Sequence, residues 1–127
     1  MEKNINFLVV DDFATMRKVL RNLLKQSGYE NVVEAEDGAA ALQIIKTQKN
    51  DFIISDWHMP NMTGFDLLKC VRADKEVSAT PFLMVTAETL PDNIISAIKA
   101  GASSYIVKPF TAEVLSEKIA KIMEKKG

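Results

Sequence analysis

The residues of this chain best suited to chemistry stand at the ends of short apolar runs. Asp11 and Asp12 follow the first such run, Asp56 ends the third, Thr86 ends the fourth and Lys108 follows the fifth. Continuous runs of this length are typical of strands buried on both faces of a parallel sheet. Because open α/β sheets bind ligands at the carboxyl ends of their strands, these five residues are candidates for one site.

Three carboxylates at one sheet edge would repel one another. If the first and third strands are neighbours, Asp11, Asp12 and Asp56 converge, because adjacent strands lie about 4.8 Å apart. At ~5 Å and an effective dielectric of ~20, each carboxylate pair costs roughly 3 kcal/mol. The cluster therefore needs a cation, and oxygen ligands without His or Cys favour Mg²⁺, which keeps open positions for phosphate oxygens.

The same residues predict phosphoryl transfer. Lys108 supplies a second positive charge and Thr86 supplies a hydroxyl group. A carboxylate, a hard divalent cation, a lysine and a hydroxyl together are typical of a phosphoryl-transfer site. An aspartate can act as the nucleophile and form an aspartyl phosphate. Asp56 is the best candidate, because it stands alone at a strand end that faces the other two carboxylates.

Apolar runs that alternate with amphipathic segments position these residues. The runs predict strands at 7–10, 32–35, 52–54, 82–85 and 105–107. The amphipathic segments predict helices at 16–24 (ending at Gly28), 39–46, 65–72 (after Gly64), 92–100 and from Thr111 onwards. This alternation favours an α/β fold with a parallel sheet and helices on both of its faces. Periodicity alone leaves two common strand orders open.

Packing is also expected at two places on these helices. The last helix is predicted to bury one apolar face, made of Val114, Leu115, Ile119, Ile122 and Met123. Cys70 is expected to be packed within the third helix.

Length and composition indicate one soluble globular domain over residues 1–127. The chain is 47% hydrophobic and 26% charged with a net charge of −1, which does not favour nucleic acid or membrane as a partner. The lone Cys70 cannot form an internal disulfide, so a reducing, cytoplasmic compartment fits best. With a single histidine, His58, a Cys/His zinc cluster is excluded. No stretch is typical of a signal peptide or a membrane span.

An ordered set of motifs resembles the receiver domain of response regulators over nearly the whole chain. These motifs are Val9-Val10-Asp11-Asp12, Ser55-Asp56 with Met59-Pro60, Gly64, Thr86-Ala87 and Lys108-Pro109-Phe110. Further stretches are similar to the stand-alone receivers of bacterial chemotaxis: Asp11-Asp12-Phe13, Thr15-Met16-Arg17, Glu34-Ala35-Glu36-Asp37-Gly38, Asp56-Trp57 and Tyr105. The resemblance implies a doubly wound, flavodoxin-like sheet of order 2-1-3-4-5 with five flanking helices.

The resemblance also implies roles for the residues of the acidic cluster. Asp11, Asp12, Asp56 and the backbone carbonyl of His58 would bind Mg²⁺, and Asp56 would be the phosphoacceptor. Lys108 would neutralise the phosphoryl group, and the bond between Lys108 and Pro109 would be cis.

A switch is implied by the same family. Thr86 would close on the phosphoryl group, and Tyr105 would swing inward when Thr86 moves. The plainer alternatives are that Asp11 or Asp12 caps the first helix, that Lys108 is a solvated loop residue, and that Tyr105 is a static core residue. Trp57 is expected to be partly exposed beside the site.

Two positions depart from the commonest chemotaxis pattern. His58 stands where an asparagine is usual, and with Glu88 it would flank the path of the hydrolysing water. We hypothesise that His58 tunes the phosphate lifetime and makes it depend on pH near neutrality, although an exposed bystander fits equally. Thr89-Leu90-Pro91 replaces lysines that motor-binding relatives often carry beside the output surface.

The expected function is a switch rather than an enzyme. A sensor histidine kinase would phosphorylate Asp56, and the output partner would be the flagellar motor switch protein, with a chemotaxis phosphatase as a further partner. The alternatives are a phosphate sink or relay in another pathway, a Mg²⁺-dependent phosphatase, and a flavin-binding module. Asp11-Asp12-Phe13 argues against the flavin module, because these carboxylates would repel phosphate without a metal. A monomer is expected.

Overall fold

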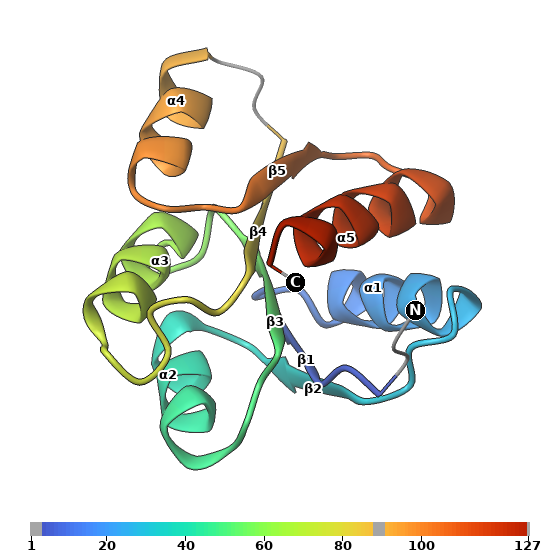
Figure 1. Cartoon of the computed structure of the whole chain (residues 1–127), viewed down its shortest axis with the longest axis horizontal. Helices are drawn as coiled ribbons and strands as arrows, with labels where there is room; N and C mark the ends of the chain where they lie inside the picture. The colour runs from blue at the N-terminus through green and yellow to red at the C-terminus, as the bar shows by residue number, and fades with distance from the viewer. Residues whose placement is uncertain (1–3, 88–90, 127) are drawn as a thin grey trace.

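The computed structural model describes residues 4–87 and 91–126, which form a parallel five-stranded sheet between helices (Figure 1). The strand order is β2-β1-β3-β4-β5, as the resemblance implied. The strands are β1 (Phe7–Val10), β2 (Val32–Ala35), β3 (Phe52–Asp56), β4 (Phe82–Thr86) and β5 (Ser104–Val107). All four strand pairings are parallel.

Burial separates the central strands from the edge strands. Every residue of β1, β3 and β4 is buried, as their continuous apolar runs predicted. The edge strands are only partly buried, so the prediction that all five runs are covered on both faces was wrong for β2 and β5. An edge strand has a neighbour on one side only, which leaves part of its surface open to solvent.

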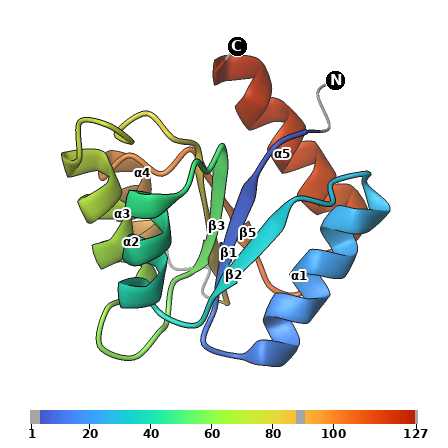
Figure 2. The same cartoon turned by 90° about the horizontal axis from the view of Figure 1, so that it is seen from below.

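Helices cover both faces of the sheet (Figure 2). Helices α1 and α5 pack on one face, where their apolar residues join side chains such as Val9, Ile54 and Val85. Helices α2, α3 and α4 cover the other face, against side chains such as Leu8 and Met84. The helices are α1 (Ala14–Gln26), α2 (Gly38–Thr47), α3 (Gly64–Ala73), α4 (Pro91–Lys99) and α5 (Ala112–Lys126).

Local sequence explains where α2, α3 and α5 begin and where α1 ends. Asp37 caps α2 by accepting from the N–H of the third helical residue, and Thr63 and Asp66 form a capping box on α3. The Thr111 hydroxyl accepts the Val114 N–H at the start of α5. Helix α1 ends before Gly28, whose φ of 94° is a conformation that glycine adopts readily.

The predicted buried face of α5 is confirmed at Leu115, Ile119 and Ile122, whereas the packing predictions for Val114 and Cys70 were wrong. Val114 is 41% exposed, whereas Leu115 beside it is buried, because the face that α5 turns to the sheet is narrower than its apolar stripe. Cys70 is exposed on α3 rather than packed within it. Among the described residues, no helix is both long and apolar enough to cross a membrane.

Candidate functional site

Strand register brings the predicted site residues to one edge of the sheet. Val10 of β1 pairs with Ser55 of β3, so continuing this register by one residue sets Asp11 opposite Asp56. Asp11 and Asp56 also have the same parity along their strands as core residues of the face covered by α1 and α5. Their side chains therefore leave the sheet on the same face, directly beyond the core.

The three carboxylates do converge. One carboxylate oxygen from each of Asp11, Asp12 and Asp56 lies within 4.8 Å of the others. Lys108 Nζ lies 3.0 Å from Asp56 Oδ1 and 3.7 Å from Asp11 Oδ2. The bond between Lys108 and Pro109 is cis, as the resemblance implied. Lys108 is thus an ion-pair partner of the cluster, not the solvated loop residue of the plainer alternative.

Two oxygens of this cluster are buried without a hydrogen bond. They are Asp11 Oδ2 and Asp12 Oδ1. A buried carboxylate oxygen without a hydrogen bond costs free energy, because it is shielded from water and accepts from no donor; for Asp11 Oδ2, the Lys108 ammonium group at 3.7 Å is too far away for a hydrogen bond. A divalent cation would satisfy both, and a set made only of oxygen donors suits Mg²⁺. The residues present therefore fit the predicted metal.

The surroundings of Asp11 raise its pKa above the ordinary value. Burial is the largest cause, because it disfavours the charged form, and the charges of Asp56 and Asp12 act in the same direction. The hydrogen bond from the Phe13 N–H and the charge of Lys108 oppose this rise without cancelling it. Asp11 therefore resists ionisation in the absence of a cation, and a bound cation would relieve this resistance.

The start of α3 packs closely against the backbone of Asp56. Its backbone carbonyl accepts the Ser55 hydroxyl at 3.0 Å. A Cβ added to Gly64 would collide with this same carbonyl oxygen, so the approach of α3 to β3 requires glycine. The Gly64 N–H donates to the Trp57 carbonyl at 2.8 Å, and the half-buried Trp57 ring stacks on Phe65 at 5.5 Å. Trp57 is thus partly exposed beside Asp56, as expected.

Thr86 and Tyr105 lie on neighbouring strands. Thr86 ends β4, is buried, and accepts the Lys108 N–H through its backbone carbonyl at 2.9 Å. It pairs with Val107, so Thr86 and Tyr105 share the sheet face that α4 covers. Tyr105 is half-buried, and Lys118 Nζ lies 4.9 Å from its ring centroid.

The tuning and output positions are described only in part. His58 is exposed, two residues after Asp56. Glu88, Thr89 and Leu90 lie outside the described residues, and of Pro91 only its place at the start of α4 is described.

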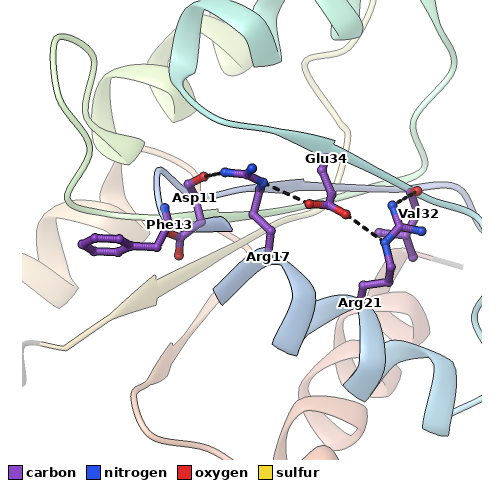
Figure 3. A network of polar contacts seen from close by, with 6 residues as sticks. All are labelled: Asp11, Phe13, Arg17, Arg21, Val32 and Glu34. Carbon is purple, nitrogen blue, oxygen red and sulfur yellow. Dashed lines mark hydrogen bonds and ion pairs between the residues drawn. The ribbon is translucent and has the colours of Figure 1, made fainter. Parts of the chain in front are cut away.

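Sequence analysis missed a charged network behind the cluster (Figure 3). Glu34 on β2 accepts from Arg17 Nε at 3.0 Å and from Arg21 Nε at 2.9 Å. Arg17 Nη1 also donates to the Asp11 backbone carbonyl at 2.8 Å. A signal was available: Glu34 has the same parity in β2 as Val32, so it faces α1, where Arg17 and Arg21 are four residues apart.

Helix capping does not account for the paired aspartates. The N-cap residue of α1 is Phe13, and it makes no side-chain capping hydrogen bond. The Asp11 carboxylate instead accepts the N–H of Phe13 itself, at 2.9 Å. The alternative that Asp11 or Asp12 serves only as a cap was therefore wrong.

Fold and site together define the class of protein. Residues 7–120 match the response regulator receiver domain, and the chain belongs to this family. Among solved structures it is similar to the chemotaxis response regulator CheY4 of Vibrio cholerae, with a TM-score of 0.86, 38% identity and coverage of 94% of this chain and 98% of that one. The receiver domain of the Francisella response regulator 1452 has a TM-score of 0.87 at 30% identity, covering 98% and 100%.

Chemotaxis proteins are similar in sequence over nearly the whole chain. The chemotaxis protein CheY of Pseudomonas aeruginosa is 52% identical over 121 residues, which are 95% of this chain and 98% of that protein. The chemotaxis protein CheY-3 of Vibrio cholerae is 50% identical over 125 residues, covering 98% and 96%.

Proposed function

We propose that this chain is a Mg²⁺-dependent phosphoacceptor switch with Asp56 as the phosphorylated residue. The observation that carries the proposal is the pair of buried, unsatisfied oxygens on Asp11 and Asp12 beside an Asp56–Lys108 ion pair. Such a site leaves carboxylate oxygens free to coordinate a metal ion. It also keeps the Lys108 ammonium group next to the Asp56 carboxylate. The 1–127 chain acts as one receiver domain.

Each residue has a definite task in this chemistry. Bound Mg²⁺, held by Asp11, Asp12, Asp56 and the His58 carbonyl, would neutralise negative charge on the incoming phosphoryl group. Asp56 supplies the attacking carboxylate oxygen. Lys108, already 3.0 Å from Asp56, moves its ammonium group to the transferred phosphoryl oxygens. The donor's leaving group departs on the opposite side, and the donor is the phosphohistidine of a sensor kinase.

Phosphorylation then changes the face of β4 and β5 that α4 covers. The Thr86 hydroxyl turns to a phosphoryl oxygen and vacates space on the face that it shares with Tyr105. Moving a two-state equilibrium from 1:99 to 99:1 takes about 5.5 kcal/mol. Two or three charge-assisted hydrogen bonds at ~1.5–3 kcal/mol each contribute ~3–9 kcal/mol in total, a range that includes this value.

The output is contact with another protein; the chemotaxis relatives favour a chemotaxis target, and the proposed target is the flagellar motor switch. The protein works in the cytoplasm as a monomer, receives its phosphoryl group from the chemotaxis kinase and is reset by its own hydrolysis or by a chemotaxis phosphatase. A sink or relay for another pathway would have the same chemistry without the motor contact. Direct binding to the motor switch protein, with and without phosphorylation, separates these two uses.

The exposed His58 side chain is proposed to tune the phosphate lifetime. It is exposed two residues after Asp56, and the family resemblance implies that it flanks the path of the hydrolysing water. Replacing His58→Asn should therefore change the rate of dephosphorylation, measured as loss of the acyl phosphate with time. An unchanged rate would make His58 the bystander of the alternative hypothesis.

Intact mass spectrometry after incubation with acetyl phosphate tests the phosphoacceptor directly. Wild-type protein should gain one phosphoryl group only when Mg²⁺ is present, and Asp56→Asn should gain none. Asp92→Asn is a matched control, because Asp92 is exposed on α4. Phosphorylation of Asp56→Asn at the wild-type level would reject Asp56 as the acceptor, and rapid multiple turnover would favour a phosphatase instead.

A further inference from the structure

Arg17 connects Asp11, a member of the acidic cluster, to Glu34 on the edge strand β2 (Figure 3). One side of its guanidinium group binds the Asp11 backbone carbonyl at 2.8 Å, and Nε binds Glu34 at 3.0 Å. The Arg17 side chain is only 16% exposed. Because a guanidinium group is planar and rigid, it fixes the β1–α1 junction relative to β2.

The carbonyl that Arg17 binds belongs to the peptide unit between Asp11 and Asp12. This unit is planar, so holding its oxygen restricts the backbone of both residues. Asp11 is held at two further points, since its N–H donates to Ala35 at 3.2 Å and its Oδ1 accepts from Phe13 at 2.9 Å. These contacts direct Asp11 Oδ2 toward the cluster, where it has no hydrogen bond.

The junction between Asp12 and α1 lacks the device that fixes other helix starts. The side chains of Asp37 and Thr63 cap α2 and α3, whereas Phe13 at the start of α1 makes no side-chain cap. Arg17 therefore provides a tether at a point where a capping side chain is missing.

We propose that Arg17, oriented by Glu34, is a positioning residue that holds Asp11 and Asp12 in the arrangement that binds Mg²⁺. The inference rests on the proposed function, because it requires that the cluster take the ion. Residues that orient metal ligands typically contribute about 10–100-fold to metal affinity. Arg17 acts through one peptide unit, so a loss of about tenfold is expected when it is removed.

The sign of the effect distinguishes positioning from simple electrostatics. Arg17 is a positive charge next to a site for a cation. On Coulombic grounds alone, its removal would make the site more negative and strengthen Mg²⁺ binding. Loss of positioning predicts weaker binding, in the opposite direction.

Arg21 provides a matched control. It binds the same carboxylate, Glu34, at 2.9 Å, and it lies one helical turn further along α1. Its remaining hydrogen bond goes to the Val32 carbonyl at 2.9 Å, on β2 and not at the site. Removing Arg21 therefore breaks a similar ion pair without releasing the peptide unit of Asp11 and Asp12.

The test is a Mg²⁺ titration in which Trp57 fluorescence reports binding. Unfolding in urea is measured on the same proteins. Arg17→Met and the charge-preserving Arg17→Lys should both raise the Kd for Mg²⁺ by about tenfold, and Arg21→Met should leave it unchanged. If Arg17→Met does not fold, Arg17→Lys decides the question.

Tighter or unchanged Mg²⁺ binding in the Arg17 variants would overturn the inference and leave the proposed function intact. Equal weakening in Arg21→Met would also overturn it, because the effect would then come from the shared ion pair. Wild-type protein that does not respond to Mg²⁺ would reject the proposed function and this inference together.

Discussion

Two groups of charged side chains flank β1, and they differ in how well their charges are satisfied. In the acidic cluster, three carboxylates converge, the Lys108 ammonium group pairs with two of them, Asp56 and Asp11, and two buried oxygens lack hydrogen bonds. In the neighbouring network, one carboxylate, that of Glu34, pairs with two arginines, and each of its oxygens accepts a hydrogen bond.

The pKa values of Asp11 and Glu34, one carboxyl from each group, move in opposite directions. Burial raises the pKa of Asp11, and the neighbouring carboxylates raise it further. Burial also opposes the ionisation of Glu34, but the hydrogen bonds and charges of Arg21 and Arg17 together outweigh it and lower the pKa. Of these two groups, the one whose charge is unbalanced is the one where a ligand is expected, and the balanced group next to it holds the backbone of Asp11 through Arg17.

Removing Lys108 should give the largest effect on the metal-free protein. Lys108→Met leaves three carboxylates without their cation, and breaking a buried pair in this way costs about 3 kcal/mol of unfolding free energy. Urea unfolding at neutral pH measures this loss, and added Mg²⁺ should recover part of it. A Lys108→Met protein as stable as wild type would show that the cluster is not under electrostatic strain.

Neutralising a carboxylate of the cluster should instead stabilise the metal-free protein. Asp11→Asn removes two repulsions of ~3 kcal/mol each and one attraction to Lys108 of ~4 kcal/mol, so a gain of about 2 kcal/mol is expected. The same change should weaken Mg²⁺ binding. Urea unfolding in EDTA measures the change in stability. A decrease would contradict the claim that repulsion between the carboxylates destabilises the metal-free protein.

Neutralising Glu34 should instead lower the free energy of unfolding, by a smaller amount. Glu34→Gln replaces charge-assisted hydrogen bonds at a partly exposed site, for a loss of about 1 kcal/mol at neutral pH. Because the folded pKa of Glu34 is lowered, this stabilisation is fully present above its ordinary value of 4.5 and disappears as pH falls through the folded pKa.

Unfolding in urea across this acidic range checks the Glu34 prediction. The difference in stability between wild type and Glu34→Gln should shrink as pH falls. A difference that stays constant with pH would show that the lost stability comes from packing and not from the carboxylate charge.

Much of the site's geometry could be predicted because alternate residues of a strand point to the same face of the sheet. Asp11, Asp56 and Lys108 each stand two residues after a core residue of one sheet face, so a parallel register brings them together once the strand order is known. The order itself came from the resemblance, since periodicity does not determine which strands are neighbours.

Other features depended on tertiary packing that no local pattern contains. Val114 and Leu115 are adjacent apolar residues on α5, and only the placement of that helix against β5 determines which one is buried. Arg17 lies on an amphipathic helix where an arginine is common, and its contact with Asp11 depends on the packing of α1 against β1. Gly64 was recognised at a helix start, but its close approach to the Asp56 carbonyl was not.

The most direct test of the central claim is Trp57 fluorescence during a Mg²⁺ titration, followed by beryllofluoride, in wild type and Asp56→Asn. Trp57 directly follows Asp56 and is the only tryptophan in the chain. The account predicts a saturable change with Mg²⁺ in wild type, then a second change with beryllofluoride that Asp56→Asn does not show. No response of wild-type protein to either addition would contradict it, because the unsatisfied carboxylates would then have no ligand to bind.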